Sequence, residues 1–360
     1  MKAAASVSSP VTHPAVTPPA QQELLAENGN APQVAIEGGA VFAVAGEDSL
    51  LRAALRAGIG FPHECSVGGC GACRFELLDG QMEELWSEAP GLGERDRRRG
   101  KRLACQSRVI GDCRVKVRCD DSYRPVIRPL RCSARLVHRR LLSADMAELG
   151  FEADQPVDFL PGQYALLALP GVRGLRAYSM SNVADGSGLL QFIVRRTPDG
   201  TGSALLVDRL GTGARIDIDV PYGHAYLREH EDRPIVCVAG GSGLAPMLSI
   251  ARRAAALSRP VDFFFGARSV SDLCADEMLE ALPGFGERLR LHNVVSGPAE
   301  AGWRGATGWV HDEVDRVIGA SAAGREFYFA GPPAMIESLQ TLLMLRRQVP
   351  FPQLHFDRFV

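Results

Sequence analysis

The sequence predicts a multidomain protein of mixed α+β and α/β class. At 360 residues it exceeds the size at which one hydrophobic core usually serves a whole chain. Short strands separated by Gly and Pro fill its middle, which is typical of an antiparallel β-barrel. Short buried strands alternate with helical segments in its last third, which indicates a doubly wound parallel sheet. We therefore divide the chain into a disordered tail (1–33), a small mixed-sheet domain (34–124), the barrel (125–232) and the parallel-sheet domain (233–360).

Composition excludes several classes of protein. A formal net charge of −2 gives no overall attraction to nucleic acid or acidic lipid, and no apolar run approaches the roughly 20 residues of a membrane helix. The N-terminal residues lack the continuous apolar stretch of a secretory signal, so we expect a cytoplasmic location. In that reducing compartment the nine cysteines are metal ligands or buried thiols rather than disulfides. We also expect a monomer.

The elements of the first domain follow from hydrophobic periodicity. Residues 1–33 are rich in Ala, Pro, Ser and Thr without periodicity, which predicts disorder. The stretch "QVAIEGGAVFAV" alternates around Gly-Gly as a hairpin does, and Asp48 is placed to cap a helix that ends at Gly58. A cysteine-rich loop, the strand "CRFELLDG", a charged helix and the strand "CRVKVRC" complete a small mixed sheet.

The cysteine loop predicts an iron-sulfur centre. Cys65, Cys70 and Cys73 have the spacing C-x4-C-x2-C, and Cys105 follows at a distance, which matches the four thiolates of a plant-type [2Fe-2S] cluster. The intervening Gly68, Gly69, Gly71 and Ala72 have little or no side chain, so the backbone can approach the cluster and its N–H groups can point at the sulfurs. A zinc site usually needs two CxxC pairs, and a redox dithiol explains neither Cys65 nor the glycines.

The fourth ligand has two further candidates, Cys113 and Cys119. In "CRVKVRC" both cysteines share one face of a strand with the two valines, and the charged residues take the other face. This pattern predicts that both thiols are buried in a core. Cys105 lies in a loop-like segment and is the preferred ligand. We interpret Cys132, Cys237 and Cys274 as small buried residues.

The later strands are read from the same patterns. In the barrel we expect strands at "CSARLVHRRLL", "YALLALP", "LLQFIVRRT" and "ARIDIDVPYG", and in the parallel sheet at "PIVCVAG", "VDFFFGA", "LRLHNVVS" and "EFYFAG". The turn "GGSGLAP" joins a buried strand to a helix, so its backbone amides and the helix dipole suit a diphosphate. The segments "FGAR" and "AGPP" end two other parallel strands, at the edge where such sheets bind ligands.

A plant-type ferredoxin segment followed by "RAYSMSN" and "GGSGLAP" resembles the iron-sulfur flavoprotein reductases of the ferredoxin-reductase family, over roughly 34–360. The segments "ELWSEAPGL", "GPPAMI" and "PFPQLHFDRFV" are similar to the reductase components of toluene and alkene di-iron monooxygenases. The resemblance implies a β-grasp [2Fe-2S] domain, an FAD-binding barrel and an NAD(P)-binding domain. It also implies electron transfer from NADH through FAD and the cluster to a hydroxylase in aromatic hydrocarbon catabolism.

The resemblance also assigns site residues. It implies that Arg176 binds the FAD pyrophosphate, where a planar fork of donors is useful, that Tyr178 lies against the flavin, and that Ser179 lies near flavin N5 as the catalytic side chain. In the family "PGQY" (161–164) and "GTGS" close around the same pyrophosphate. The expected FAD-binding set also includes Asn182, Gly200, Gly202, Ser203 and the C-terminal Phe359. The expected nucleotide-binding set is Gly240, Gly241, Gly243, Pro246, Gly266, Arg268, Gly331 and Pro332.

Several alternatives stay open. An exposed turn would explain "RAYS" without a cofactor, and core packing would explain Phe356. Asp272 after "FGAR", without a further basic pair, favours NADH, while Arg268 keeps NADPH open. Relatives commonly carry cysteine where this chain has Ala330, which puts the rate of hydride transfer in question.

The partner is the least determined part of the prediction. The run "ERDRRRGKR" is a solvated helix face or a surface that steers an acidic oxygenase, with Arg97, Arg98 and Arg99 as its carriers. The expected partner is a di-iron hydroxylase component or its Rieske or ferredoxin carrier. Alternatives are a reductase of a Rieske-type dioxygenase and a non-catalytic FAD-binding assembly subunit.

Overall fold

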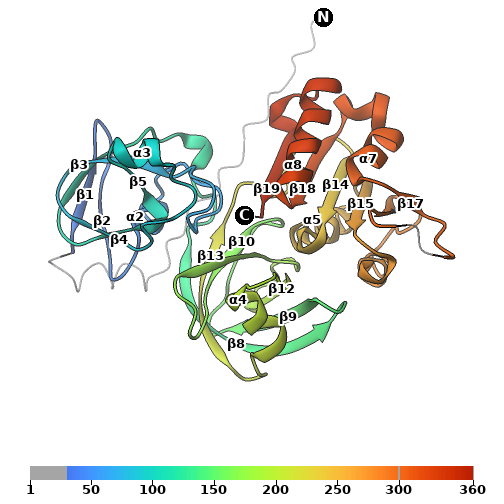
Figure 1. The fold of residues 1–360 in the computed structure, drawn as a ribbon, viewed down its shortest axis with the longest axis horizontal. Coiled ribbons are helices and arrows are strands. Elements are labelled where there is room, and N and C mark those ends of the chain that lie inside the picture. Colours follow the sequence, from blue (N-terminus) through green and yellow to red (C-terminus); the bar gives the residue numbers. More distant parts are fainter. Residues whose placement is uncertain (1–30, 299–300, 360) are drawn as a thin grey trace, which may run out of the picture.

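The computed structural model describes residues 31–298 and 301–359. Figure 1 shows three bodies: a small domain at the left in blue, a barrel at the bottom centre in green, and a layered domain at the upper right in yellow to red. Most of the predicted disordered tail, residues 1–30, lies outside the described residues. No helix among the described residues is both long enough and apolar enough to cross a membrane.

The small domain is a β-grasp fold. Its sheet has the order β2-β1-β7-β3-β5, in which β1 pairs antiparallel with β2 and parallel with β7. The predicted hairpin is therefore confirmed. The sheet packs against the buried helix α2, and β4 and β6 form a separate two-stranded sheet. The elements are β1 (Gln33–Ile36), β2 (Val41–Ala43), α2 (Leu50–Arg56), β3 (Arg74–Asp79), β4 (Met82–Glu84), α3 (Glu94–Arg98), β5 (Lys101–Leu103), β6 (Ser107–Val109) and β7 (Cys113–Lys116).

Two local predictions for this domain were wrong. The N-cap of α2 is Ser49, whose hydroxyl accepts the N–H of Arg52; Asp48 instead forms ion pairs with Arg52 and Arg56. Cys119 is exposed because β7 ends at Lys116, before the alternation reaches it. Cys113 is buried, as predicted.

The middle domain is a six-stranded antiparallel barrel. Its strands follow the order β11-β10-β13-β8-β9-β12, and an antiparallel bridge between Met180 and Phe192 joins the two outer strands. Closure removes free sheet edges and encloses a core of alternating inward side chains. The elements are β8 (Leu130–Leu141), β9 (Met146–Ala153), β10 (Tyr164–Ala168), β11 (Leu175–Ser179), β12 (Leu189–Arg195), the short helix α4 (Thr201–Ala204), a π-helical turn (Leu205–Arg209) and β13 (Arg215–Tyr222).

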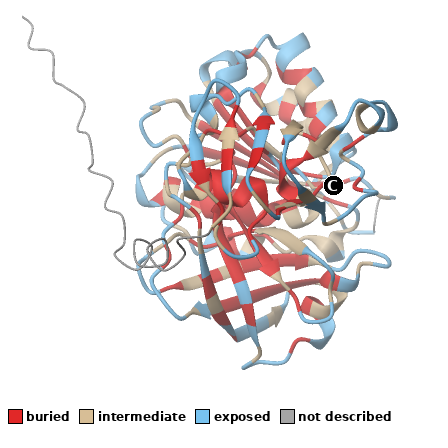
Figure 2. Cartoon of the chain, turned by 90° about the vertical axis from the view of Figure 1, so that its left-hand side faces the viewer, coloured by how far each residue is buried: buried red, intermediate tan, exposed pale blue. Residues whose placement is uncertain are grey.

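The last domain is a parallel sheet covered on both faces. Its order is β17-β16-β15-β14-β18-β19, and every pair is parallel. Helices α5 and α6 pack on one face and α7 and α8 on the other. The central strands β14, β15 and β18 are therefore almost wholly buried, and Figure 2 shows red strands inside this domain. The elements are β14 (Ile235–Gly240), α5 (Leu244–Ala256), β15 (Val261–Ala267), α6 (Asp276–Glu280), β16 (Leu289–Val295), β17 (Ala306–Thr307), α7 (Val310–Ile318), β18 (Glu326–Gly331), α8 (Pro333–Gln340) and β19 (Leu354–Arg358).

The chain reverses its direction of travel across this sheet at β14. Strands β15, β16 and β17 extend the sheet on one side of β14, and β18 and β19 return to the other side. Such a switch point leaves a crevice at the carboxyl ends of the strands. The predicted turn "GGSGLAP" begins at the carboxyl end of β14.

The β-grasp domain and the barrel share one hydrophobic core. Tyr164, Leu166 and Tyr222 of the barrel belong to the same cluster of buried side chains as the core of the first domain. An ion pair of 2.6 Å joins Arg56 of α2 to Asp219 of β13, whose side chain is 2% exposed. A buried, hydrogen-bonded ion pair fixes orientation, because breaking it leaves a charge without compensation.

Candidate functional site

The four predicted cluster thiols come together as two pairs. The Sγ atoms of Cys73 and Cys105 lie 3.4 Å apart, and the thiol of Cys70 hydrogen-bonds to that of Cys65. No three Cys, His, Asp or Glu side chains of the described residues converge as ligands of a single metal ion. Two thiolates for each of two irons is the ligand set of a [2Fe-2S] cluster, so the donor set fits that group.

Backbone amides surround the thiols. The N–H groups of Gly69 and Cys70 donate to Cys65 Sγ over 3.2 and 3.3 Å, and the N–H of Ala72 donates to Cys70 Sγ over 3.4 Å. A hydrogen bond from the Cys70 thiol, together with those from the amides of Val67, Cys70 and Gly69, lowers the pKa of the Cys65 thiol to about 6. The loop is therefore arranged to stabilise negative charge on sulfur.

The alternative ligands lie elsewhere. The thiol of Cys113 donates to the carbonyl oxygens of Gln81 and Gly111, which lie 3.3 and 3.1 Å from its sulfur. Cys119 is exposed beyond the end of β7. The geometry thus favours Cys105 as the fourth ligand.

A covering segment, residues 85–92, closes over the cysteine loop. The N–H of Gly91 donates to the carbonyl of Gly68 over 2.9 Å, and a Cβ on Gly71 would lie only 2.3 Å from Gly91 O, so only glycine fits there. The guanidinium of Arg97 donates to the carbonyls of Ala89 and Leu92 over 2.7 and 3.0 Å. Arg97 therefore fixes the covering segment, which differs from its expected role as a free docking charge.

The cysteine loop touches the barrel through Tyr164. The hydroxyl of Tyr164 contacts the hydroxyl of Ser66 and donates to the carbonyl of Glu64. In the antiparallel register of β10 and β11, Tyr164 is the direct partner of Ser179. The "PGQY" tyrosine, expected near a pyrophosphate, is thus 4% exposed and links the cysteine loop to the strand of the predicted catalytic serine.

The motif "RAYS" lies on β11, against the "GTGS" loop. A Cβ on Gly202 would lie 3.4 Å from Cγ of Arg176, so the missing side chain brings the loop backbone against the arginine. Tyr178 is partly buried, which raises the pKa of its hydroxyl to about 12, and Ser179 is buried. Nη1 of Arg176 donates to the backbone carbonyls of Arg173 and Leu175 over 3.0 and 3.1 Å. The planar fork of this arginine beside the loop fits the donors that an FAD pyrophosphate would need.

Two of the predicted FAD-binding side chains are engaged within the protein. The Asn182 amide bonds the backbone of Leu189 and Gln191 over 2.8 and 2.9 Å, and the Asn182 carbonyl accepts the hydroxyl of Ser249 on α5 over 2.6 Å. The Ser203 hydroxyl binds Thr197 and the carbonyl of Gly200. These side chains hold the barrel, its loop and α5 in place.

The glycine turn after β14 depends on close backbone contacts. A Cβ on Gly243 would lie 1.9 Å from Ala330 O, so this position admits no other residue without movement. Gly241 has φ +55, and the guanidinium of Arg195 lies 3.3 Å from where its Cβ would be. Pro246 is buried in the first turn of α5, and Gly331 closes against Gly240.

A cleft of about 1650 Å³ lies between the barrel and the carboxyl ends of the parallel strands. Such a volume suits a nucleotide. The predicted residues that line it are Gly200, Gly240, Gly241, Gly266, Arg268, Pro332 and Phe359. Lining residues that sequence reasoning missed include Arg195, Arg196, Arg209, Trp309 and His311. The sequence offered one signal for these lining residues, the adjacent Arg195 and Arg196 just before "GTGS". No pattern around Trp309 indicated that it lines the cleft.

The C-terminal aromatics separate into two environments. Phe356 stacks on Phe329 in the core, with ring centroids 5.1 Å apart, whereas Phe359 lines the cleft. Ala330 is fully buried on β18 and pairs with Asp357 of β19. Of the two C-terminal aromatics, only Phe359 is therefore exposed to the cleft.

Three family models match successive parts of the chain. Residues 34–109 match the 2Fe-2S iron-sulfur cluster binding domain, residues 133–226 the oxidoreductase FAD-binding domain, and residues 237–341 the oxidoreductase NAD-binding domain. The three matches follow the order of the β-grasp domain, the barrel and the parallel sheet.

Relatives align along almost the whole chain. A ferredoxin–NAD(P)(+) reductase of Metapseudomonas resinovorans is 38% identical over 91% of this chain and 99% of its own. The ferredoxin–NAD(+) reductase component of an alkene monooxygenase system of Xanthobacter autotrophicus is 39% identical over 89% and 98%. The solved ferredoxin reductase in carbazole 1,9a-dioxygenase superposes with a TM-score of 0.85 at 35% identity, covering 91% of this chain and 98% of its own. The chain therefore belongs to the ferredoxin–NAD(P)+ reductases of oxygenase systems, oxidoreductases with a 2Fe-2S domain, an FAD-binding domain and an NAD-binding domain.

Proposed function

We propose that this protein is the electron-transfer reductase component of a multicomponent monooxygenase whose hydroxylase contains a di-iron centre. One observation carries the proposal: Tyr164 of the FAD-binding barrel binds the cysteine loop while pairing with Ser179. The barrel strand and the cluster loop are thus held in contact within one chain. When bound, FAD accepts a hydride and releases electrons singly, and a [2Fe-2S] cluster carries single electrons.

The residues have separate tasks in this proposal. Cys65, Cys70, Cys73 and Cys105 hold the cluster, and the covering segment excludes water from it. Arg176 binds the FAD pyrophosphate together with the backbone of the Gly200–Ser203 loop. With FAD bound, Ser179 would be the catalytic residue next to the flavin, Tyr178 would lie against the flavin, and Phe359 would cover it. Holding the reactants at about 3–3.5 Å is the main contribution that a protein makes to such a transfer.

NADH is the proposed donor. Two arginines of the cleft are already paired with carboxylates: Arg195 lies 2.7 Å from Asp145, and Arg196 lies 3.2 Å from Asp208. Arg268 is exposed after β15 and is the cation best placed for a 2′-phosphate. Arg209 also lines the cleft, but from the barrel side. Among the described residues that line the cleft, Arg268 is the only Arg or Lys of the parallel-sheet domain, which supports NADH.

The second candidate partner is a Rieske-type dioxygenase. A specific observation favours it: the superposed solved structure is the reductase in a carbazole dioxygenase. The relative from an alkene monooxygenase system is 39% identical to this chain, against 35% for that solved structure. This difference supports the first candidate, a di-iron monooxygenase. The expectations of a cytoplasmic monomer stay predictions.

The test is a visible spectrum of the purified protein, with iron and FAD counted, before and after anaerobic NADH. We expect flavin and cluster absorbance that bleaches on NADH addition, and a smaller rate with NADPH. Adding purified di-iron hydroxylase or Rieske components then separates the two partners by which one is reduced. Protein that binds both cofactors but does not bleach would be a non-catalytic assembly subunit.

A further inference from the structure

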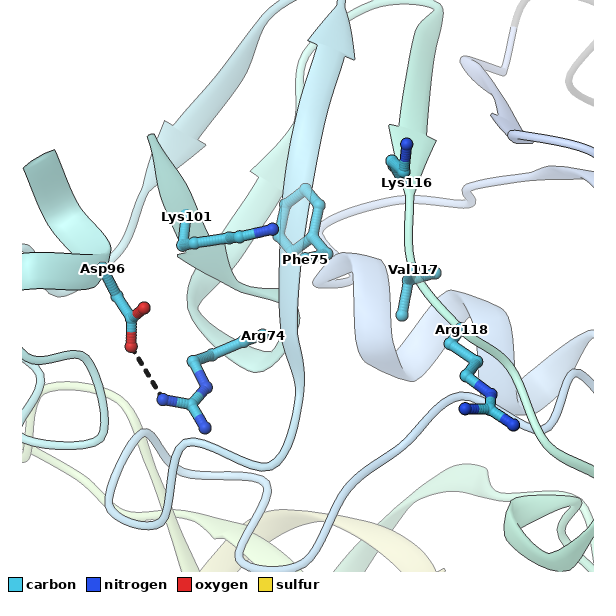
Figure 3. A pocket seen from close by; sticks show the side chains of 7 residues that line it. All are labelled: Arg74, Phe75, Asp96, Lys101, Lys116, Val117 and Arg118. Carbon is cyan, nitrogen blue, oxygen red and sulfur yellow. Dashed lines mark hydrogen bonds and ion pairs between the residues drawn. The ribbon is translucent and has the colours of Figure 1, made fainter. Parts of the chain in front are cut away.

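The outer face of the β-grasp sheet carries a basic hollow of about 230 Å³, formed by residues of β3, β5, β7 and α3. Figure 3 shows four cationic side chains around it, Arg74, Lys101, Lys116 and Arg118, with Asp96 at one side. Its apolar lining comes from Phe75 and Val117. We call these seven residues the basic hollow.

Three of the four cations of the basic hollow are paired with carboxylates, but through exposed or half-exposed side chains. Arg74 binds Asp96 over 2.7 Å, and the arginine side chain is 51% exposed. Lys101 and Lys116 both face Glu76 across the sheet, yet Lys101 binds Glu76 while Lys116 binds Glu37, each over 3.1 Å. The four side chains of these two pairs are 35–60% exposed, so the pairs contribute little and exchange readily with other carboxylates. Arg118 is exposed on the same face.

The surrounding segment is strongly basic although the chain is not. Residues 94–118 contain ten Arg and Lys but only three Asp and Glu, whereas the whole chain has a net charge of −2. Only three lysines occur in the chain, at 2, 101 and 116, and two of them line the basic hollow. A local field of one sign attracts a partner of the other sign.

The basic hollow is adjacent in the chain to the buried pair of cluster thiols. Arg74 directly follows Cys73, and its cross-strand partner is Leu103, two residues before Cys105. A partner seated on β3 and β5 is therefore held against strands whose ends lie next to Cys73 and Cys105, two of the four proposed cluster ligands.

The barrel packs against another side of the cysteine loop. Ser66 contacts Tyr164 of the barrel, and the ring of His63 lies edge-on to that of His224 with centroids 4.4 Å apart. Electrons therefore enter the β-grasp domain from the barrel side, and a protein acceptor must approach over another face.

We infer that the basic hollow is the surface on which an acidic patch of the electron-accepting protein docks. This inference rests on the proposed function and specifies the partner's surface. It replaces the docking role expected for Arg97, which is bound to the covering segment. Arg98, also paired with Glu94, and Arg99 on α3 lie outside the hollow's lining.

The test uses the holoprotein with two acceptors: acidic cytochrome b5 and the small dye dichlorophenolindophenol. In Lys101→Glu/Lys116→Glu we expect NADH-driven reduction of cytochrome b5 at low salt to fall about tenfold, and that of the dye to stay unchanged. The difference should shrink as salt is added. Binding of fluorescently labelled cytochrome b5, followed by anisotropy, should weaken in parallel.

Matched variants make the result decisive. The double variant Arg215→Glu/Arg346→Glu changes the net charge equally at exposed sites outside the β-grasp domain and should reduce cytochrome b5 within about twofold of the wild-type rate. Lys101→Gln/Lys116→Gln, which places no like charge beside Glu76, should show a smaller loss and serves if the glutamate variant fails to fold. Unchanged cytochrome b5 rates in both hollow variants, or an equal loss in the control, would overturn the inference. A wild-type protein that reduces no dye would instead reject the proposed function.

Discussion

The hydroxyl of Tyr164 lies 2.8 Å from the hydroxyl of Ser66, across the boundary between the barrel and the β-grasp domain. Tyr164 also stacks on Tyr222, which donates to Asp219, the carboxylate paired with Arg56. The β-grasp domain is thus tied to the barrel at two linked points, one in the cysteine loop and one at the end of α2. Such contacts hold the two domains in one orientation, and the following predictions use that arrangement.

Tyr164→Phe removes the hydroxyl contacts with Ser66 and Glu64 but keeps the ring. We expect a net loss of about 1 kcal/mol in domain docking, faster hydrogen exchange in residues 61–69, and slower cluster reduction after the flavin is reduced. Stopped-flow spectroscopy at flavin and cluster wavelengths measures both phases. Tyr222→Phe, which loses a hydrogen bond outside the cysteine loop, is the control. Equal exchange in the two variants would refute the linking role.

Cys105→Ser should abolish the cluster, because its thiol is 3.4 Å from that of Cys73. Iron content and visible absorbance should fall, while bound FAD stays near one per chain. Cys113→Ser is the matched control, since that thiol binds carbonyl oxygens instead. Loss of iron in the control alone would assign the fourth ligand to Cys113.

Ser179→Ala should slow the reduction of FAD by NADH about tenfold, the effect of losing one positioned hydrogen bond. Retention of FAD should stay close to that of the wild type. Ser181→Ala is a suitable comparison, because its buried hydroxyl has no partner within the described residues. An unchanged hydride-transfer rate in single-turnover measurements would remove Ser179 from the catalytic role.

Gly243→Ala places a methyl group 1.9 Å from the carbonyl oxygen of Ala330. The strain should lower the free energy of unfolding of the parallel-sheet domain by about 2–4 kcal/mol, seen as a lower urea midpoint. Gly211→Ala, where nothing lies within 4 Å of the added atom, should change stability by less than about 0.5 kcal/mol. Similar midpoints for both variants would contradict the close packing.

The raised pKa of Asp357 leads us to expect that the stability of the fold depends on pH. Burial, with a smaller contribution from the charge of Glu64, raises the pKa of its carboxyl from 3.8 to about 7. Because the folded protein holds this proton while the unfolded chain releases it, stability falls as pH rises from about 4 to about 7 and then levels off. Asp357→Asn should therefore gain melting temperature relative to wild type as pH rises through this range. A constant difference between the two proteins from pH 4 to 8 would show that Asp357 does not titrate there.

The sequence predicted the fold class because its signals are local. Strand alternation, buried runs and turn glycines specify each element through its own residues, and the strands "QVAI", "LLQFIVR" and "FFFGA" lie where those patterns placed them. The cysteine spacing likewise indicated a cluster, since a tight loop sets which thiols can meet. Local signals failed at element ends: Ser49 rather than Asp48 caps α2, and β7 stops before Cys119.

Tertiary structure alone decided how the parts meet. Tyr164 was expected near a pyrophosphate yet binds the cysteine loop, and Arg97 was expected in solvent yet holds the covering segment. The convergence of Arg195 and Trp309 on one cleft was also absent from the sequence pattern. These contacts join residues far apart in the chain, so they depend on how packed domains orient their side chains, which no short-range periodicity encodes.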